Sequence, residues 1–178
     1  LARVTGKTRG NVILRDRQYT SSKDEKRSLE ISKNCISGKV YNARWVLERA
    51  IRDHAMQIDK ERVKVASLQL KTFLQYIQNA ESKEQLRGYE GKAASIYFSV
   101  FDELILQQKK DFFFHGRSKR PPMDNVNAML SFVYTLLTNQ ITSALESVGL
   151  DPCVGYLHTE RPGRASLALD LIEEFRAV

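Results

Sequence analysis

"LRGYEGKAASIYFSVFDEL", residues 86–104, is the stretch that decides the fold class. Its apolar side chains recur every three or four positions and form one stripe: Leu86, Ala93 or Ala94, Tyr97, Phe101 and Leu104. This spacing is typical of an amphipathic helix that packs on a core. We therefore predict a helix from about residue 83 to about residue 106.

Glu90 lies in line with this apolar stripe, where a carboxylate is expensive unless it is paired, hydrogen-bonded or bound to a metal. Gly88 and Gly91 flank it, and such poor helix formers suggest that something approaches the backbone closely. The alternative is that Glu90 lies in the first turn, where the helix dipole favours an acid whose head reaches water. The pattern alone favours this alternative.

Other parts of the sequence also have helical spacing. Residues 40–51, 63–77 and 124–148 follow the period, and residues 21–36 follow it more loosely. A mostly basic loop, "QQKKDFFFHGRSKRPPM", separates the last two long helices, and its Gly116 and paired prolines interrupt the period. These patterns predict a mainly α, multi-helix domain.

Residues 1–20 differ in composition from the rest of the chain, because they contain turn glycines and the Val-, Ile- and Leu-rich "NVILRDRQY". We interpret them as one or two strands, the C-terminal remnant of a β-rich N-terminal domain and its linker. The predicted boundary lies near residue 20, so that residues 21–178 form the helical domain. Because "EEFRAV" ends within an apparently continuing helix, we expect this domain to be truncated at its C-terminus.

The charge and composition of the chain limit the classes of function that it can have. The chain has 178 residues, a formal net charge of +7 and a pI near 9.5, which favour a polyanionic partner such as nucleic acid or an anionic membrane. No apolar run approaches the ~20 residues of a spanning helix, and no signal peptide is recognisable, so we expect a soluble, cytoplasmic protein. Cys35 and Cys153 lie in no C-x-x-C spacing, which argues against a disulfide framework and a thiolate zinc site.

"YLHTERPGRASLALDLIEEF", residues 156–175, combines a histidine, a basic turn and an acidic helix. At 100° per residue, Asp170 and Glu173 lie within roughly 60° of each other and face away from the apolar side of the helix. These two acids can share a site. The alternatives are an ordinary polar helix face and a packed or capping histidine, and periodicity alone favours them.

Four stretches taken together resemble one family, the CRISPR-associated integrase and endonuclease of the spacer-acquisition module, which is the first-numbered Cas protein. They are "GNVILRDRQY", "LRGYEGKAASIYF", "RPPMDNVNAMLSFVYTLL" and "VGYLHTERPGRASLALDLIEEF". Their order and spacing match the family over essentially the whole chain. The resemblance implies a β domain followed by a helical catalytic domain. It also implies a metal-dependent DNA integrase and endonuclease that inserts new spacers into the CRISPR array by phosphodiester transesterification or hydrolysis.

The resemblance further implies one divalent metal ion held by Glu90, His158 and Glu173, with Asp170 as a supporting or alternate ligand. Two carboxylates and an imidazole suit Mg²⁺ or Mn²⁺ and leave positions open for a phosphodiester oxygen. His115 in the basic loop is an alternative ligand that we rank well below His158.

Several side chains are expected to contact DNA around this site. Arg87, Arg161 and Arg164 are placed to hold flanking phosphates, and Ser166 to add a hydrogen bond. Asn127 and Tyr134 match positions that the family uses near the site, although packing and capping roles explain them nearly as well.

The family also implies partners: branched or double-stranded DNA from spacer fragments and the CRISPR repeat, a second small Cas adaptation protein, and a homodimer formed through the β domain. No membrane is expected. Two rival classes explain the same charge and helices without catalysis, a helical DNA-binding scaffold and a helical protein-interaction module.

Overall fold

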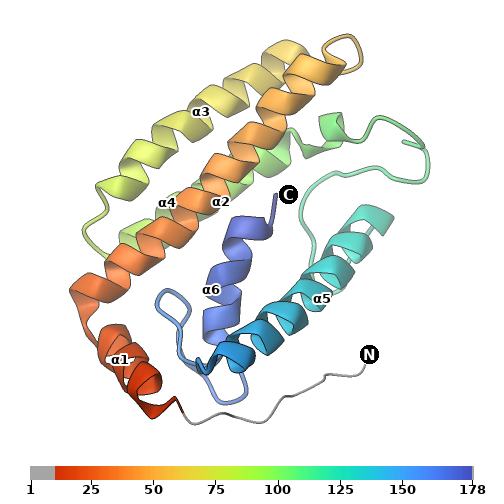
Figure 1. Ribbon diagram of the computed structural model, residues 1–178. Coiled ribbons are helices and arrows are strands. Elements are labelled where there is room, and N and C mark those ends of the chain that lie inside the picture. The colour runs from red at the N-terminus through yellow and green to blue at the C-terminus, as the bar shows by residue number, and fades with distance from the viewer. Residues whose placement is uncertain (1–10, 178) are drawn as a thin grey trace.

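A single long helix, α2 (Glu25–His54), forms the axis of the computed structural model, which describes residues 11–177. It has 30 residues and is therefore about 45 Å long. Two helices, α3 (Lys60–Gln78) and α4 (Lys83–Ser99), pack along it, and Figure 1 shows all three side by side. Each of the three begins after a capping side chain that accepts a hydrogen bond from the backbone N–H three residues later: Asp24, Asp59 and Ser82.

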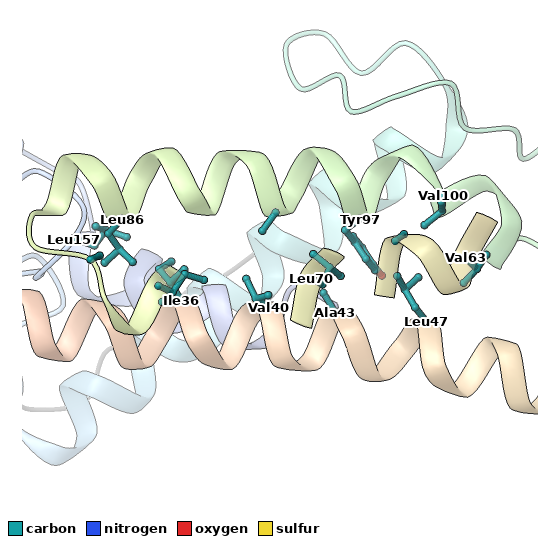
Figure 2. Packing of buried hydrophobic residues seen from close by; sticks show 14 residues of the cluster. Ile36, Val40, Ala43, Leu47, Val63, Leu70, Leu86, Tyr97, Val100 and Leu157 are labelled. Atoms are coloured by element: carbon teal, nitrogen blue, oxygen red, sulfur yellow. The ribbon is translucent and has the colours of Figure 1, made fainter. Parts of the chain in front are cut away.

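The main core lies between these three helices. Ile36 and Leu47 of α2, Leu70 and Ile77 of α3, and Leu86 of α4 have no exposed side-chain surface. Figure 2 shows the cluster between the facing sides of α2 and α4. Burial of one such side chain contributes about 1.5–3 kcal/mol, so this cluster stabilises the packing of α4 on α2.

Two further helices, α5 (Asn125–Val148) and α6 (Ser166–Phe175), complete the site-bearing side of the fold. α6 packs against both α2 and α5 and lies between them in Figure 1. Gly149 ends α5 in the left-handed conformation, with φ of 88°, as a glycine does at low cost. The chain then returns through a loop, residues 150–165, to the start of α6.

The predicted strand in "NVILRDRQY" is wrong, because these residues begin α1 (Val12–Lys23). Asn11 caps the helix by accepting from the backbone N–H of Leu14 at 3.3 Å. Gln18 is buried, and its amide donates to the backbone oxygens of Asp151 at 2.8 Å and Val154 at 3.1 Å. These tertiary bonds favour a helix against the strand propensity of Val and Ile. Residues 1–10, the rest of the predicted β remnant, lie outside the described residues.

Apart from the predicted strand, the prediction of a mainly α fold is confirmed over residues 11–177. The helix predicted over residues 124–148 begins one residue later, at Asn125, because Asp124 is its cap. The helix predicted to run to about residue 106 ends at Ser99, and a 3₁₀ turn, Phe101–Leu104, follows it. In the part of the chain that the structure describes, no helix has the length and apolar character to cross a bilayer.

Candidate metal and nucleic-acid site

Glu90, His158 and Glu173 line one pocket of about 280 Å³. They come from three separate segments: α4, the loop before α6, and α6 itself. Ile36 and Leu157 supply apolar wall, while Arg87 and Arg164 supply positive charge. Packing of the helices thus brings together the three residues for which a shared site was expected.

Asp170 holds the His158 loop rather than facing this pocket. It is 1% exposed, and its Oδ2 accepts from the backbone N–H groups of Tyr156 at 2.6 Å and Leu157 at 3.1 Å. Its Oδ1 accepts from the backbone N–H of His158 at 3.0 Å and lies 2.7 Å from the ring Nδ1. A proton on Nδ1 then leaves Nε2 as the lone-pair donor of the ring, an arrangement common in metal-binding histidines.

Glu90 is half-buried and sits in the middle of α4, not in its first turn, where the acid is Glu84. Its carboxylate forms an ion pair with Lys39, a residue of α2 that is 8% exposed. The same ammonium lies 2.6 Å from Oε2 of Glu173. Lys39 therefore bridges the two acids. A carboxylate on an apolar stripe needs a partner, and Lys39 is that partner for Glu90.

Glu173 is 3% exposed, so the face of α6 that carries the two acids is buried and not an ordinary polar face. Its Oε1 pairs with Arg176 at 2.9 Å, whereas its Oε2 has no partner with hydrogen-bond geometry despite the nearby ammonium. This oxygen therefore contacts the ammonium of Lys39 as an ion pair without a hydrogen bond of good geometry. The donor set of two carboxylates and one imidazole suits a hard divalent ion.

Within residues 11–177 no three acid, histidine or cysteine side chains are grouped closely enough to hold an ion as they stand. The ammonium of Lys39 contacts both Glu90 and Glu173, the two acids of the expected ligand set.

Glycines beside Glu90 leave open space. A Cβ added at Gly88 or Gly91 would meet no protein atom within 4 Å outside its own helix. The close approach that these glycines suggested is therefore not made by the described protein. Gly155 does need its missing side chain, because a Cβ there would lie 2.8 Å from Ser166 and 2.9 Å from Asp170 Oδ2.

Glu90 also lines a larger cavity of about 550 Å³ and is the residue that the two cavities have in common. The apolar wall of the larger cavity includes Tyr97 and Phe98, and its basic residues are Lys39, Arg117, Lys119 and Arg176. His115 lines this cavity and not the one that contains His158.

Tyr134 organises two of the cavity's cations. The guanidinium carbons of Arg117 and Arg176 lie 5.6 Å and 5.3 Å from its ring centroid, within the range of cation–π attraction. The hydroxyl of Tyr134 donates to the backbone oxygen of Arg176 at 3.2 Å. Burial raises the pKa of Tyr134, so it stays a neutral phenol between two positive charges.

Asn127 is fully buried and builds the basic loop instead of facing a ligand. Its Oδ1 accepts from Arg117 at 2.6 Å and from the backbone N–H of Ser118 at 3.0 Å. Its amide nitrogen donates to the backbone oxygen of Gly116 at 2.8 Å and to Asp124 at 2.7 Å. Asn127 can therefore reach a nucleic acid only through Arg117, which it positions.

The other residues that are expected to contact DNA differ in how exposed their side chains are. Arg87 is exposed, donates to the backbone oxygen of Leu157 at 2.7 Å, and so connects α4 to the histidine loop. Arg161 is exposed on the turn before α6, and the half-buried Arg164 lines the smaller pocket. Ser166 is fully buried, and its hydroxyl donates to the backbone oxygen of Thr159 at 3.2 Å.

Three residues of the site were missed from the sequence: Lys39, Arg117 and Arg176. For Lys39 a signal existed, because it lies on the apolar stripe of α2 beside Ile36 and Val40, just as Glu90 lies on the stripe of α4. Arg117 and Arg176 carry no comparable signal, since basic residues in loops and at helix ends are usually solvated.

Comparison with known proteins identifies relatives over the whole chain. A sequence model of the family described as CRISPR associated protein Cas1 matches residues 1–178. The chain is 49% identical over 177 residues to the CRISPR-associated endonuclease Cas1 1 of Chlorobaculum tepidum, with 99% of this chain and 52% of that protein covered. It is 48% identical over 164 residues to the CRISPR-associated endonuclease Cas1 of Leptospira interrogans, with 92% and 65% covered. The chain thus spans about half to two thirds of the length of these curated relatives.

Solved structures give the same result for the fold. One is a casposase bound to an integration product, with a TM-score of 0.78, 29% identity, and 95% of this chain and 45% of that chain covered. Another is a Cas6-RT-Cas1–Cas2 complex, with a TM-score of 0.80, 26% identity, and 99% and 19% covered.

Proposed function

The chain belongs to the CRISPR associated protein Cas1 family, and we propose on this basis that it carries the catalytic site of a divalent-metal-dependent DNA endonuclease and integrase. Its reaction would insert new spacers into a CRISPR array. The convergence of Glu90, His158 and Glu173 on one pocket is the observation that carries the proposal.

Glu90, Glu173 and Nε2 of His158 would hold Mg²⁺ or Mn²⁺. When bound, the ion would polarise a phosphodiester oxygen and stabilise the charge that develops as the bond is exchanged. The acidic side chains supply charge that balances the ion, and Oε2 of Glu173, which now faces the ammonium of Lys39, would supply a ligand atom. Asp170 would act as a supporting group, because it fixes the ring of His158 and four hydrogen-bond contacts already occupy its two oxygens.

Basic side chains around the pocket would hold the DNA backbone. Arg87 and Arg164 face the pocket, and Arg161 extends the positive surface along the turn. Arg117 and Arg176 add charge on the side of the larger cavity. Cations thus line both cavities that share Glu90, which suits a strand that passes over the acids with its phosphates held by basic side chains.

The reaction would be a transesterification in which the 3′ hydroxyl of a spacer fragment attacks a phosphodiester of the repeat. The attacked phosphorus gains a bond to the new oxygen and loses its bond to the 3′ oxygen of the broken strand, which leaves as a hydroxyl after protonation. Water in place of the attacking hydroxyl would give hydrolysis.

Partners follow from the same family membership. Relatives are solved as a casposase with an integration product and as a Cas1–Cas2 complex. By analogy we propose branched or double-stranded DNA and a Cas2 protein as partners of the protein that contains this chain. A homodimer through an N-terminal β domain belongs to the same proposal.

Strand transfer on a branched DNA substrate with Mn²⁺ tests the function, with the partner protein present and absent. Glu90→Ala and His158→Ala should abolish product formation. Glu61→Gln, which changes an exposed acid in the first turn of α3, is the matched control and should keep the activity. DNA binding that persists with no metal-dependent product in any preparation would favour the non-catalytic scaffold.

A further inference from the structure

Lys39 occupies the space between the two acids that are expected to hold the ion. We infer that Lys39 is a positioning residue whose ammonium takes the place of the divalent cation in the metal-free protein and must move when the cation binds. This inference rests on the proposed function and assigns a role to a residue outside the expected ligand set.

The position of Lys39 is fixed by the helix that carries it. Residue 38 of α2 is a glycine, and a Cβ there would lie 3.1 Å from Cγ of Glu174 on α6. Asn42, one turn later, donates to the backbone oxygen of Glu174 at 2.7 Å. α2 and α6 therefore approach each other closely on both sides of Lys39, and its side chain is directed toward Glu90 and Glu173.

Charge balance explains why a cation is needed at this point. Without Lys39, the buried carboxylate of Glu173 would keep only Arg176, and the nearby half-buried Glu90 would have no cationic partner. Buried charges without partners are strongly destabilising. The ammonium thus stabilises the metal-free site by supplying the positive charge that an ion would otherwise supply.

The contact of Lys39 with Glu173 is an ion pair to one carboxylate oxygen. The ammonium lies 2.6 Å from Oε2, yet this buried oxygen has no partner with hydrogen-bond geometry. Oε1 of the same carboxylate is paired with Arg176. Lys39 therefore supplies positive charge beside Oε2, and this charge would have to be displaced before a metal ion could bind the same oxygen.

The two cavities give the cation and the ammonium separate paths. His158, Glu90 and Glu173 line the smaller pocket, and Lys39 does not. Lys39 lines the larger cavity, where a flexible four-carbon stem gives its head room to move away from the acids. An ion would approach from the histidine side while the ammonium withdraws into the larger cavity.

Repulsion makes this movement necessary. A divalent ion between Glu90 and Glu173 would lie within a few ångströms of an ammonium that stayed in place, and such like charges repel strongly at low dielectric. Metal binding must therefore overcome the ion pairs of Lys39, which lowers the apparent affinity of the site for the metal.

Mn²⁺ binding to the DNA-free chain, measured by calorimetry and electron paramagnetic resonance, tests the inference without using activity. Lys39→Met removes the charge and keeps the stem, and Lys39→Gln is a second neutral variant that can still donate a hydrogen bond. Lys64→Met removes the same charge from an exposed position of α3 and is the matched control.

We expect the Lys39 variants to bind Mn²⁺ at least tenfold more tightly than the unaltered chain, while their melting temperature without metal falls by about 5 °C or more. Lys64→Met should change neither quantity. Unchanged or weaker Mn²⁺ binding in a folded Lys39 variant would overturn the inference and leave the metal site standing. Absence of Mn²⁺ binding in every protein, the unaltered chain included, would overturn the proposed function itself.

The unaltered chain provides a second test, because it does not depend on the folding of a variant. Acetylation by a lysine reagent should be slow at Lys39 without metal and faster in saturating Mn²⁺, relative to Lys64 in the same sample. A rate ratio that Mn²⁺ does not change would show that the ammonium stays in place and would overturn the inference.

Discussion

Oδ1 of Asp170 lies 3.0 Å from the backbone nitrogen of His158 and 2.7 Å from Nδ1 of its ring. One carboxylate oxygen thus fixes both the position and the orientation of the histidine. Since Oδ2 of the same residue accepts from the two preceding N–H groups, this one buried side chain fixes three consecutive residues, 156–158, of the loop before α6.

Asp170→Asn should therefore cost stability more than it costs metal binding. The new NH₂ group cannot accept from backbone N–H groups, so we expect a loss of about 3–5 kcal/mol in the free energy of unfolding. Urea unfolding measures it, and Asp16→Asn on the exposed face of α1 is the control, expected within about 0.5 kcal/mol of the unaltered chain. A stable Asp170→Asn protein that binds no Mn²⁺ would identify Asp170 as a ligand.

Mn²⁺ should raise the melting temperature, because three ligands from separate segments come together only in the native state. At a free concentration of about 100 times Kd the gain is about 2.7 kcal/mol, or roughly 5–10 °C for a chain of this size. Glu173→Gln should abolish the shift, whereas Asp170→Asn should keep part of it. Thermal scans with Ca²⁺ as a comparison separate this binding from a general salt effect. An undiminished shift in Glu173→Gln would remove Glu173 from the ligand set.

Gly155→Ala and Gly88→Ala should change stability in opposite directions. The first places a Cβ 2.8 Å from the backbone carbon of Ser166 and 2.9 Å from Asp170 Oδ2, and we expect a cost of about 3 kcal/mol. The second meets nothing within 4 Å in an exposed helix position and should gain about 0.5–1 kcal/mol. Denaturant midpoints of the two variants suffice. Equal effects would mean that the loop is not packed on α6 as described.

Cys35 should make stability fall at alkaline pH. Burial, followed by the nearby carboxylate of Glu174, raises the pKa of this thiol from 9.0 to about 12. Because the folded pKa lies above the unfolded one, the contribution is complete below pH 9 and is lost as pH rises toward 12.

Cys35→Ala should flatten the alkaline fall by up to about 1.4 kcal/mol per pH unit in this window, as measured by urea unfolding between pH 8 and roughly pH 11. Cys153→Ala, at an exposed position, should not. The buried Tyr97, whose pKa is also raised by burial, contributes equally to all three proteins. Identical slopes in the two variants would contradict the burial of the Cys35 thiol.

Affinity for branched DNA should fall linearly with salt on a double-logarithmic plot. Arg164→Ala should reduce the magnitude of the slope by about 1, because one phosphate contact is lost. Arg49→Ala, an exposed arginine of α2 that pairs with Asp53, is the control of equal charge. A slope that Arg164→Ala leaves unchanged would place the DNA elsewhere on the protein.

Helical spacing predicted the long helices because each of them buries one stripe of side chains, and such a stripe appears in the sequence as a regular period. It did not predict α1, where Gln18 is fixed by Asp151 and Val154, partners more than 130 residues away. Such contacts leave no periodic trace in the sequence.

The site, like the fold, could be predicted from the sequence only in part. Glu90 attracted notice because it interrupts an apolar stripe, and His158 and Glu173 because the chain resembles a known family. The bridge that Lys39 makes between the acids could not be predicted, since a stripe position shows that a charge is buried but not which opposite charge meets it.

The buried ion pairs of Lys39, Glu173 and Arg176 also bear on how such sequences evolve. Well-packed apolar residues in place of a buried ion pair are often neutral or stabilising, so selection for stability alone would not maintain these charges. A copy of this domain that had lost its chemistry and survived as a scaffold would be free to replace them. Under the proposed function, retention of this charged trio in a newly sequenced relative would therefore indicate a domain that keeps the site, even before any assay.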